Sequence, residues 1–388
     1  MRPISNALLF TAFFFITGGA IGQDKTKNKF GKGITIAAQD SSFSMKFSTR
    51  IQTLYEGQYN TATGDYSDRM QIRRARLKFD GFVYDPSFEY KIELAVANSD
   101  ITSGSIPQSG NTANFVLDAV VKWNFYKRWS VWFGQTKLPG NRERVISSQN
   151  LQFVDRSLVN ARFNLDRDAG LQFHYNAPRI NLVGAVSMGE GRNMIVENVG
   201  GYNYTLRGEY LPFGQFKKKG DYISADLERE ETPKLSVGVT YDFNDEASRE
   251  RGQLGDFLNV QRDLSTLFID SHFKYRGFSS LIEYAHRETP DGPVILNEGG
   301  DIESVFYTGR GISIQGGYLF ESNFEIAARF TDIDPEEITR RNDHTQYTLG
   351  VSRYFVNHSL KIQSDVSLTQ EAGEADTWMY RFQVEVAF

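Results

Sequence analysis

Apolar and polar residues alternate one by one along most of this 388-residue chain, and this alternation limits the fold more than any other feature. The C-terminus shows it most clearly, with apolar side chains at Trp378, Tyr380, Phe382, Val384, Val386 and Phe388. Because successive side chains of a strand point to opposite faces, a period of two predicts strands with one apolar and one polar face. The pattern predicts about sixteen strands, at residues 43–59, 69–84, 86–97, 114–125, 129–137, 167–177, 179–188, 201–211, 233–243, 264–276, 277–288, 305–320, 322–332, 344–356, 357–369 and 376–388.

The connections between these strands alternate between short turns and longer polar loops. The short turns are 85–86, 126–128, 176–178, 276–277, 321–322 and 357–358. The long loops are 60–68, 98–113, 138–166, 189–200, 244–263, 289–304, 333–343 and 370–375. A soluble β-sandwich also alternates apolar and polar residues, but it gives no reason for this order of loop lengths. A transmembrane barrel has short turns at one end and long loops at the other, so residues 43–388 predict an all-β transmembrane antiparallel β-barrel.

Two further patterns bear on this prediction. Aromatic residues stand near strand ends, as interfacial girdles require; examples are Tyr59, Phe125, Trp129, Tyr210, Phe320 and Phe355. One connection departs from the order, because 211–232 falls at the short-turn end yet is long and rich in Lys and Glu. It is either a large periplasmic turn or it contains one more strand pair.

The N-terminus has the pattern of a secretory signal. Arg2 precedes the apolar run Ala7–Thr17, and Ala20-Ile21-Gly22 offers the small residues that a signal peptidase reads. A buried or anchoring helix is the alternative, but the run is shorter than the ~20 residues of a spanning helix. We therefore expect a signal peptide at 1–22 and a short N-terminal periplasmic segment at 23–42.

Composition excludes several classes of protein. The chain has no cysteine, so it cannot form disulfides or thiolate metal sites. A formal net charge of −5 does not favour nucleic-acid binding. The mean hydropathy of −0.43 rules out a bundle of membrane helices but not a barrel, whose strands show lipid only every second residue.

Several motifs resemble those of the phosphate-selective porin O and P family of outer-membrane channels, over roughly residues 43–388. They are Ile72-Arg73-Arg74-Ala75-Arg76-Leu77 with Gly81, Asp118-Ala119, Trp132-Phe133-Gly134-Gln135-Thr136-Lys137-Leu138-Pro139, Asp155-Arg156-Ser157-Leu158, Arg167-Asp168-Ala169-Gly170, Leu206-Arg207 and Phe388. The resemblance implies a sixteen-stranded, usually trimeric porin that passes anions, with phosphate as the substrate.

Partners and location follow from the same resemblance and from the C-terminal strand. We expect passive uptake of small anions, with phosphate and polyphosphate as the candidate solutes. We also expect contact with outer-membrane lipids, a homotrimer and the outer membrane of a Gram-negative bacterium. The alternating aromatic strand that ends at Phe388 is the kind of signal that barrel-assembly machinery reads. We expect no cofactor, no metal and no nucleic acid.

Basic residues that face the lumen are the candidates for contact with the solute. By alternation, basic and acidic side chains nearly balance inside the barrel, but Arg74, Arg76 and Lys78 form one row without an acid before Asp80. A row of guanidinium groups suits phosphate oxygens. From the family, we expect the loop 138–166 to fold inward and narrow the channel. The candidate anion-binding and pore-lining residues are Arg50, Arg74, Arg76, Lys78, Lys122, Lys137, Arg142, Arg144, Arg156, Arg162 and Arg207.

Other functions remain open at this point. A general diffusion porin with a balanced lumen and a plugged structural barrel both fit the strand pattern. Catalysis is weakly supported, because only His174 and His272 of the five histidines face the lumen and no catalytic motif is present. The acidic stretch Asp332–Glu337 could bind Ca²⁺, but it lacks the glycine and spacing of an EF-hand and is better explained as a solvated loop tip.

Overall fold

A computed structural model describes residues 29–101 and 114–388 of the chain. The predicted signal peptide 1–22 lies outside the described residues, as does most of the predicted loop 98–113. Within the described ranges, no helix has the length and apolar composition needed to cross a membrane.

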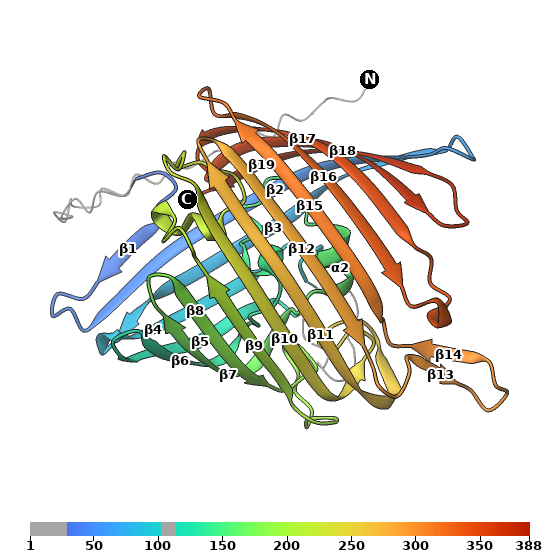
Figure 1. The fold of residues 1–388 in the computed structure, drawn as a ribbon. Helices are drawn as coiled ribbons and strands as arrows, with labels where there is room; N and C mark the ends of the chain where they lie inside the picture. The colour runs from blue at the N-terminus through green and yellow to red at the C-terminus, as the bar shows by residue number, and fades with distance from the viewer. Residues whose placement is uncertain (1–28, 102–113) are drawn as a thin grey trace, which may run out of the picture.

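The strands form a closed antiparallel barrel of sixteen strands, as predicted (Figure 1). Consecutive strands pair around the wall, and the first barrel strand closes the ring by pairing with the last, with Tyr55 opposite Phe382. The barrel strands are β2 (Phe43–Asn60), β3 (Tyr66–Val83), β4 (Asp85–Ala95), β5 (Val116–Tyr126), β6 (Trp129–Lys137), β7 (Arg167–Asn176), β8 (Ile180–Ser187), β9 (Asn203–Tyr210), β10 (Lys234–Arg249), β11 (Phe257–Tyr275), β12 (Phe278–Glu288), β15 (Gly309–Leu319), β16 (Phe324–Pro335), β17 (His344–Val356), β18 (Leu360–Glu371) and β19 (Thr377–Ala387).

Three short strands lie outside the ring. β1 (Ile34–Ala37) pairs with the start of β2, so residues of the predicted N-terminal segment extend the sheet at the end of the barrel that carries the short turns. β13 (Val294–Leu296) and β14 (Ile302–Val305) form a separate hairpin in the loop after β12, and it projects at the opposite end (Figure 1).

Strand boundaries differ from the prediction mainly at the long-loop end. β10 and β11 continue well beyond the predicted 233–243 and 264–276, with register shifts between Asn244 and Ala247. This hairpin extends past the membrane region, where the strand no longer needs an apolar face. Alternation therefore becomes weak there, and the sequence pattern alone does not reveal the extra strand residues.

The barrel interior is filled on one side by the loop 138–166, which carries the helices α1 (Arg142–Val145) and α2 (Leu158–Phe163). α2 lies inside the barrel in Figure 1, and its residues contact β12, β15 and β16. Val159 and Phe163 of α2 pack in an apolar cluster with wall residues such as Phe268 and Ile333. A Cβ at Gly311 would lie 2.8 Å from the Ile333 side chain and 3.0 Å from the Phe163 ring, so a larger residue here would force these side chains to shift.

The segment 211–232 is a large turn that folds into the barrel, not an extra strand pair. It contains a short 3-10 helix, η2 (Lys217–Tyr222), and no strand. The Lys274 Nζ donates hydrogen bonds to the Gly220 and Ala225 carbonyls, at 2.8 and 2.7 Å, which holds the turn against the inner wall. Its Ser224 N–H also donates to the Asn150 carbonyl of the inward loop, at 2.9 Å. The two inward segments therefore meet inside the barrel.

Candidate functional site

An irregularity in β3 turns two adjacent arginines toward the lumen. In the pairing with β2, Gln52 faces Arg74 and Thr53 faces Ile72, which leaves Arg73 as the extra residue of a β-bulge. Strict alternation would place Arg73 on the outer face. Instead both guanidinium groups reach Asp155 of the inward loop, with Arg73 Nη2 at 3.1 Å and Arg74 Nη2 at 2.7 Å from Oδ1.

This pair of arginines anchors the loop to the wall. Burial alone would raise the pKa of Asp155, but the charges of Arg74 and Arg73 hold it well below its usual value. Arg74 is only 4% exposed and also donates to Gln52 Oε1, at 2.9 Å. Its charge is therefore engaged by the loop rather than offered to a solute.

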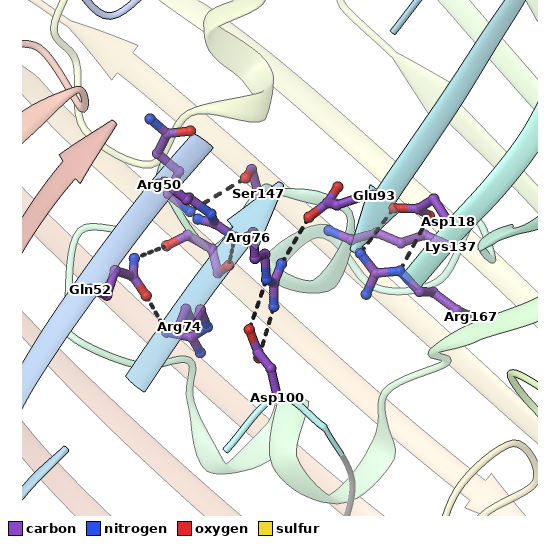
Figure 2. A network of polar contacts seen from close by, with 12 residues as sticks. Arg50, Gln52, Arg74, Arg76, Glu93, Asp100, Asp118, Lys137, Ser147 and Arg167 are labelled. Atoms are coloured by element: carbon purple, nitrogen blue, oxygen red, sulfur yellow. Dashed lines mark hydrogen bonds and ion pairs between the residues drawn. The ribbon is translucent and has the colours of Figure 1, made fainter. Parts of the chain in front are cut away.

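Arg76 lies two positions further along β3 and faces the open part of the lumen. Its Nε and Nη2 donate to both oxygens of Asp100, at 2.9 and 3.0 Å, and its Nη1 donates to Glu93, at 3.1 Å (Figure 2). The paired bonds to Asp100 have the fork geometry with which arginine also binds phosphate.

Next to Arg76, basic residues of β4, β6 and β7 share few carboxylates, and Figure 2 shows Lys137 and Arg167 among them. Arg167 donates two bonds to Asp118, both at 3.2 Å, and the Lys91 Nζ lies 2.8 Å from the same carboxylate. The Lys137 Nζ instead donates to the Arg144 carbonyl, at 2.7 Å, and no carboxylate of a described residue lies within ion-pair distance of it. Lys137 is therefore held by backbone carbonyls rather than by a carboxylate of a described residue.

A chamber of about 1080 Å³ opens between these residues and the turn 211–232. Three acidic side chains line it: Glu93, Glu209 and Asp221. Nine basic side chains line it: Arg76, Lys91, Lys122, Arg128, Lys137, Arg167, Arg207, Lys218 and Lys219. The chamber is thus strongly basic, although the protein as a whole carries a formal charge of −5.

A second cavity of about 350 Å³ shares Arg76, Lys91 and Glu93 with the chamber. It reaches the N-terminal segment and the start of β2, and the charged residues of its lining are again mostly basic. The further basic residues are Lys32, Lys46, Arg50 and Lys78. The two cavities together form a positively charged region along the β2–β9 side of the lumen, opposite the seat of α2.

The structure separates the predicted site residues into two groups. Those that line a cavity are Arg50, Arg76, Lys78, Lys122, Lys137 and Arg207. Those that line neither cavity are Arg74, Arg142, Arg144, Arg156 and Arg162.

Members of the second group hold the loop in place. Arg142 is fully buried, with its Nε 3.0 Å from Asp270 and its Nη2 3.1 Å from Glu209. Arg156 donates to the Glu143 and Ile146 carbonyls, both at 2.8 Å.

Arg144 and Arg162 occupy different surroundings. Arg144 donates to Asp166, while burial and then repulsion from Arg156 and Arg167 hold its pKa well below its usual value. Arg162 lies over the ring of Tyr307, with its Cζ 5.9 Å from the ring centroid.

Sequence reasoning did not select five of the basic residues that line the chamber: Lys91, Arg128, Arg167, Lys218 and Lys219. Lys91 and Arg167 stand at lumen-facing positions, so the alternation of inward and outward residues could have identified them. Lys218 and Lys219 lie in the turn 211–232, whose inward fold leaves no trace in strand periodicity. Their place in the lumen could only come from the structure.

The two lumen histidines have structural contacts. The ring of His174 stacks on Trp132, with centroids 4.0 Å apart, and its Nε2 lies 3.1 Å from Gln172 Oε1. His272 is held between the Asp221 and Ser224 carbonyls of the inward turn.

In the acidic stretch 332–337, the carboxylates bind separate partners. Asp332 accepts from Thr345, Asp334 from Arg310 and Glu336 from Thr308.

Comparison with known proteins supports the channel assignment. A family model described as phosphate-selective porin O and P matches residues 45–378. A protein of Aquifex aeolicus (strain VF5), described as uncharacterized, is 24% identical over 380 residues, which cover 89% of this chain and 87% of that protein.

Two solved structures share the fold. A loop L8 deletion mutant of OmpT, an outer membrane protein of Vibrio cholerae, has a TM-score of 0.60 at 11% identity, covering 89% of this chain and 100% of that chain. An anion-selective porin from Comamonas acidovorans has a TM-score of 0.56 at 11% identity, with the same coverage of 89% and 100%.

The fold and the family match have the same consequence. Both indicate a channel rather than an enzyme, located in the outer membrane of a Gram-negative bacterium. With its closed barrel of sixteen strands and a family match that spans nearly all of that barrel, this chain belongs to the phosphate-selective porin O and P family.

Proposed function

We propose that this porin conducts small anions in preference to cations, and that inorganic phosphate is one of its solutes. The observation that carries the proposal is the chamber of about 1080 Å³, where nine basic side chains stand against three acidic ones. Charges at a narrow, partly enclosed site act within the Debye length of ~8–10 Å, so salt screens them only in part.

The basic residues of the chamber keep charge available for a passing anion. The Lys122 Nζ lies over the ring of Trp132, 3.8 Å from the ring centroid, and no carboxylate of a described residue is within ion-pair distance of it. Lys137 is bound by backbone carbonyls. Arg76 and Arg167 each bind a carboxylate that a neighbouring basic residue also binds. An anion can therefore take the place of that carboxylate at the arginine without leaving the carboxylate unpaired.

The reversal potential of single channels in a KCl gradient tests this proposal. We expect a value displaced toward the chloride potential, and a shift toward cations when Lys122 and Lys137 are both replaced by Gln. Each single variant, Lys122→Gln or Lys137→Gln, is compared with Arg310→Gln, which removes one positive charge from an exposed pair with Asp334. A reversal potential of zero in the wild-type channel would refute the proposed anion preference. Inorganic phosphate that fails to block chloride current would refute the phosphate assignment.

General diffusion without selectivity is the second candidate, and a specific observation favours it. Many lumen arginines are already paired with carboxylates, for example Arg207 with Asp270 at 2.7 Å and Arg381 with Asp365 at 2.6 Å. If pairing cancels the field, the same measurement gives a reversal potential near zero. A plugged structural barrel, favoured by the two inward-folded segments, would give no conductance steps at all.

Export and assembly complete the proposal. Residues 1–22 act as a cleaved signal peptide, and 23–42 are a periplasmic segment, of which Ile34–Ala37 pairs with the start of β2. We also propose a homotrimer, which is usual for the family, and insertion through the C-terminal strand that ends at Phe388. Mass spectrometry of the mature N-terminus and the mass of the folded, detergent-solubilised protein test these assignments.

A further inference from the structure

The periplasmic half of the chamber has an apolar wall, which a channel for hydrated inorganic ions does not need. Trp132 on β6 and Val183 on β8 occupy inward positions, where neighbours at the same spacing are polar, such as Ser130 and Asn181. Both side chains are only partly buried. Phe216 of the inward turn adds a ring to the same lining. Apolar surface left in a water-filled compartment is unfavourable unless a solute covers it.

Cationic groups stand beside this apolar surface. The Lys122 Nζ lies over Trp132, and a ring beneath a lysine holds the ammonium in place without neutralising it. No carboxylate of a described residue lies within ion-pair distance of Lys122. Arg128 and Lys218 line the chamber on the periplasmic side. The chamber volume of about 1080 Å³ slightly exceeds the ~300–1,000 Å³ of sites for small organic ligands, so the chamber can hold such a solute.

We propose that this part of the chamber binds small aromatic anions, in which one carboxylate is attached to a flat ring. The carboxylate lies against Lys122, and the ring covers Val183 and the exposed edge of Trp132. This inference deepens the proposed function and rests on it, because the binding charge is the one that gives anion preference. The inference adds aromatic carboxylates to the solutes of the channel. The positive charge of the chamber alone would indicate only small anions such as phosphate.

Block of chloride current by benzoate and by acetate tests the inference. The two anions carry the same charge and carboxylate, and they differ only in the apolar body. Both are added on the periplasmic side, from which the chamber is reached without passing the residues around Arg76. If roughly 50 Å² of ring surface is buried, benzoate should reach half-block at about a tenfold lower concentration than acetate.

Three variants separate the ring from the charge. Val183→Asn, which copies the neighbouring Asn181, should bring the benzoate value close to the acetate value and leave acetate unchanged. Trp132→Gln should also remove the benzoate advantage, and it should weaken block by acetate as well, because it removes the ring beneath Lys122. Lys122→Gln should weaken block by both anions and preserve their ratio. The heat-modified mobility of each variant reports whether its barrel is folded, and the wild-type ratio decides the question even if a variant is not.

The two proposals fail in different ways. Equal block by benzoate and acetate in the wild-type channel would overturn the aromatic site, while a reversal potential toward chloride would still support anion preference. A benzoate advantage that survives both Val183→Asn and Trp132→Gln would also overturn the assignment to this wall. A wild-type reversal potential of zero would overturn the proposed function itself.

Discussion

The contact of Asp155 with Arg73 and Arg74 makes a quantitative prediction about the inward loop. Asp155→Asn keeps the size of the side chain but removes the charge that both guanidinium groups face. The loop then loses its ion pairs with β3, and two arginines are left without their carboxylate. We expect a loop that leaves its seat more often and a lumen with more unpaired positive charge.

The magnitude follows from burial. Removing one partner of a buried ion pair costs about 3–5 kcal/mol. Arg74 is almost enclosed, but the side chains of Arg73 and Asp155 are 25% and 21% exposed, so water screens part of the interaction. We therefore expect the docked loop to lose about 2–3 kcal/mol, which raises the ratio of undocked to docked loop ~30- to 150-fold.

Single-channel recordings measure this effect as current fluctuation in the open state. Asp155→Asn should increase the fluctuation and displace the reversal potential further toward chloride. Asp242→Asn is the matched control, because this buried wall carboxylate is bound by Asn203 and Thr205 and does not contact the loop. Unchanged fluctuation in Asp155→Asn, or an equal increase in Asp242→Asn, would refute the idea that the two arginines anchor the loop.

Three other predictions concern single side chains. Asp100→Asn removes the paired acceptor of Arg76, so phosphate should block chloride current at a concentration several-fold lower, and an unchanged blocking concentration would show that Asp100 does not compete with the solute. Arg76→Ser should shift the reversal potential toward cations, whereas Arg381→Ser, outside both cavities, should do so far less; equal shifts would argue against a local field. Phe382→Asp or deletion of Phe388 should reduce the heat-modifiable folded barrel on gels, because a charge on the lipid face costs up to a few kcal/mol; normal folding of both would mean that the faces of β19 are misassigned.

The strand pattern was sufficient to predict the barrel. The lipid face and the lumen face differ sharply in polarity, so a period of two is imposed on every strand that crosses the membrane. The predicted 129–137 and 344–356 coincide with β6 and β17 for this reason. At the long-loop end of the β10–β11 hairpin, the two faces no longer need to differ in polarity. The predicted strands are therefore shorter there than the observed ones.

The site was predictable only in part, because it depends on contacts between segments far apart in the chain. Alternation identified the inward side chains of Arg76 and Lys122, since each is fixed by its own strand. It could not show that a β-bulge turns Arg73 inward, because one extra residue changes the face locally. It also could not show that the turn 211–232 folds back and brings Lys218 into the chamber.

The distribution of pairing inside the barrel explains why the total of lumen charges says little about selectivity. On the side where the loop is seated, arginines such as Arg142 are buried against carboxylates, and their charge holds protein segments together. On the opposite side, the same residue types line open space, and Lys122 and Lys137 have no carboxylate partner among the described residues. A solute experiences only the second set. Anion preference therefore depends on which basic residues the inward loop leaves uncovered, and loop sequence can alter selectivity without any change in the wall.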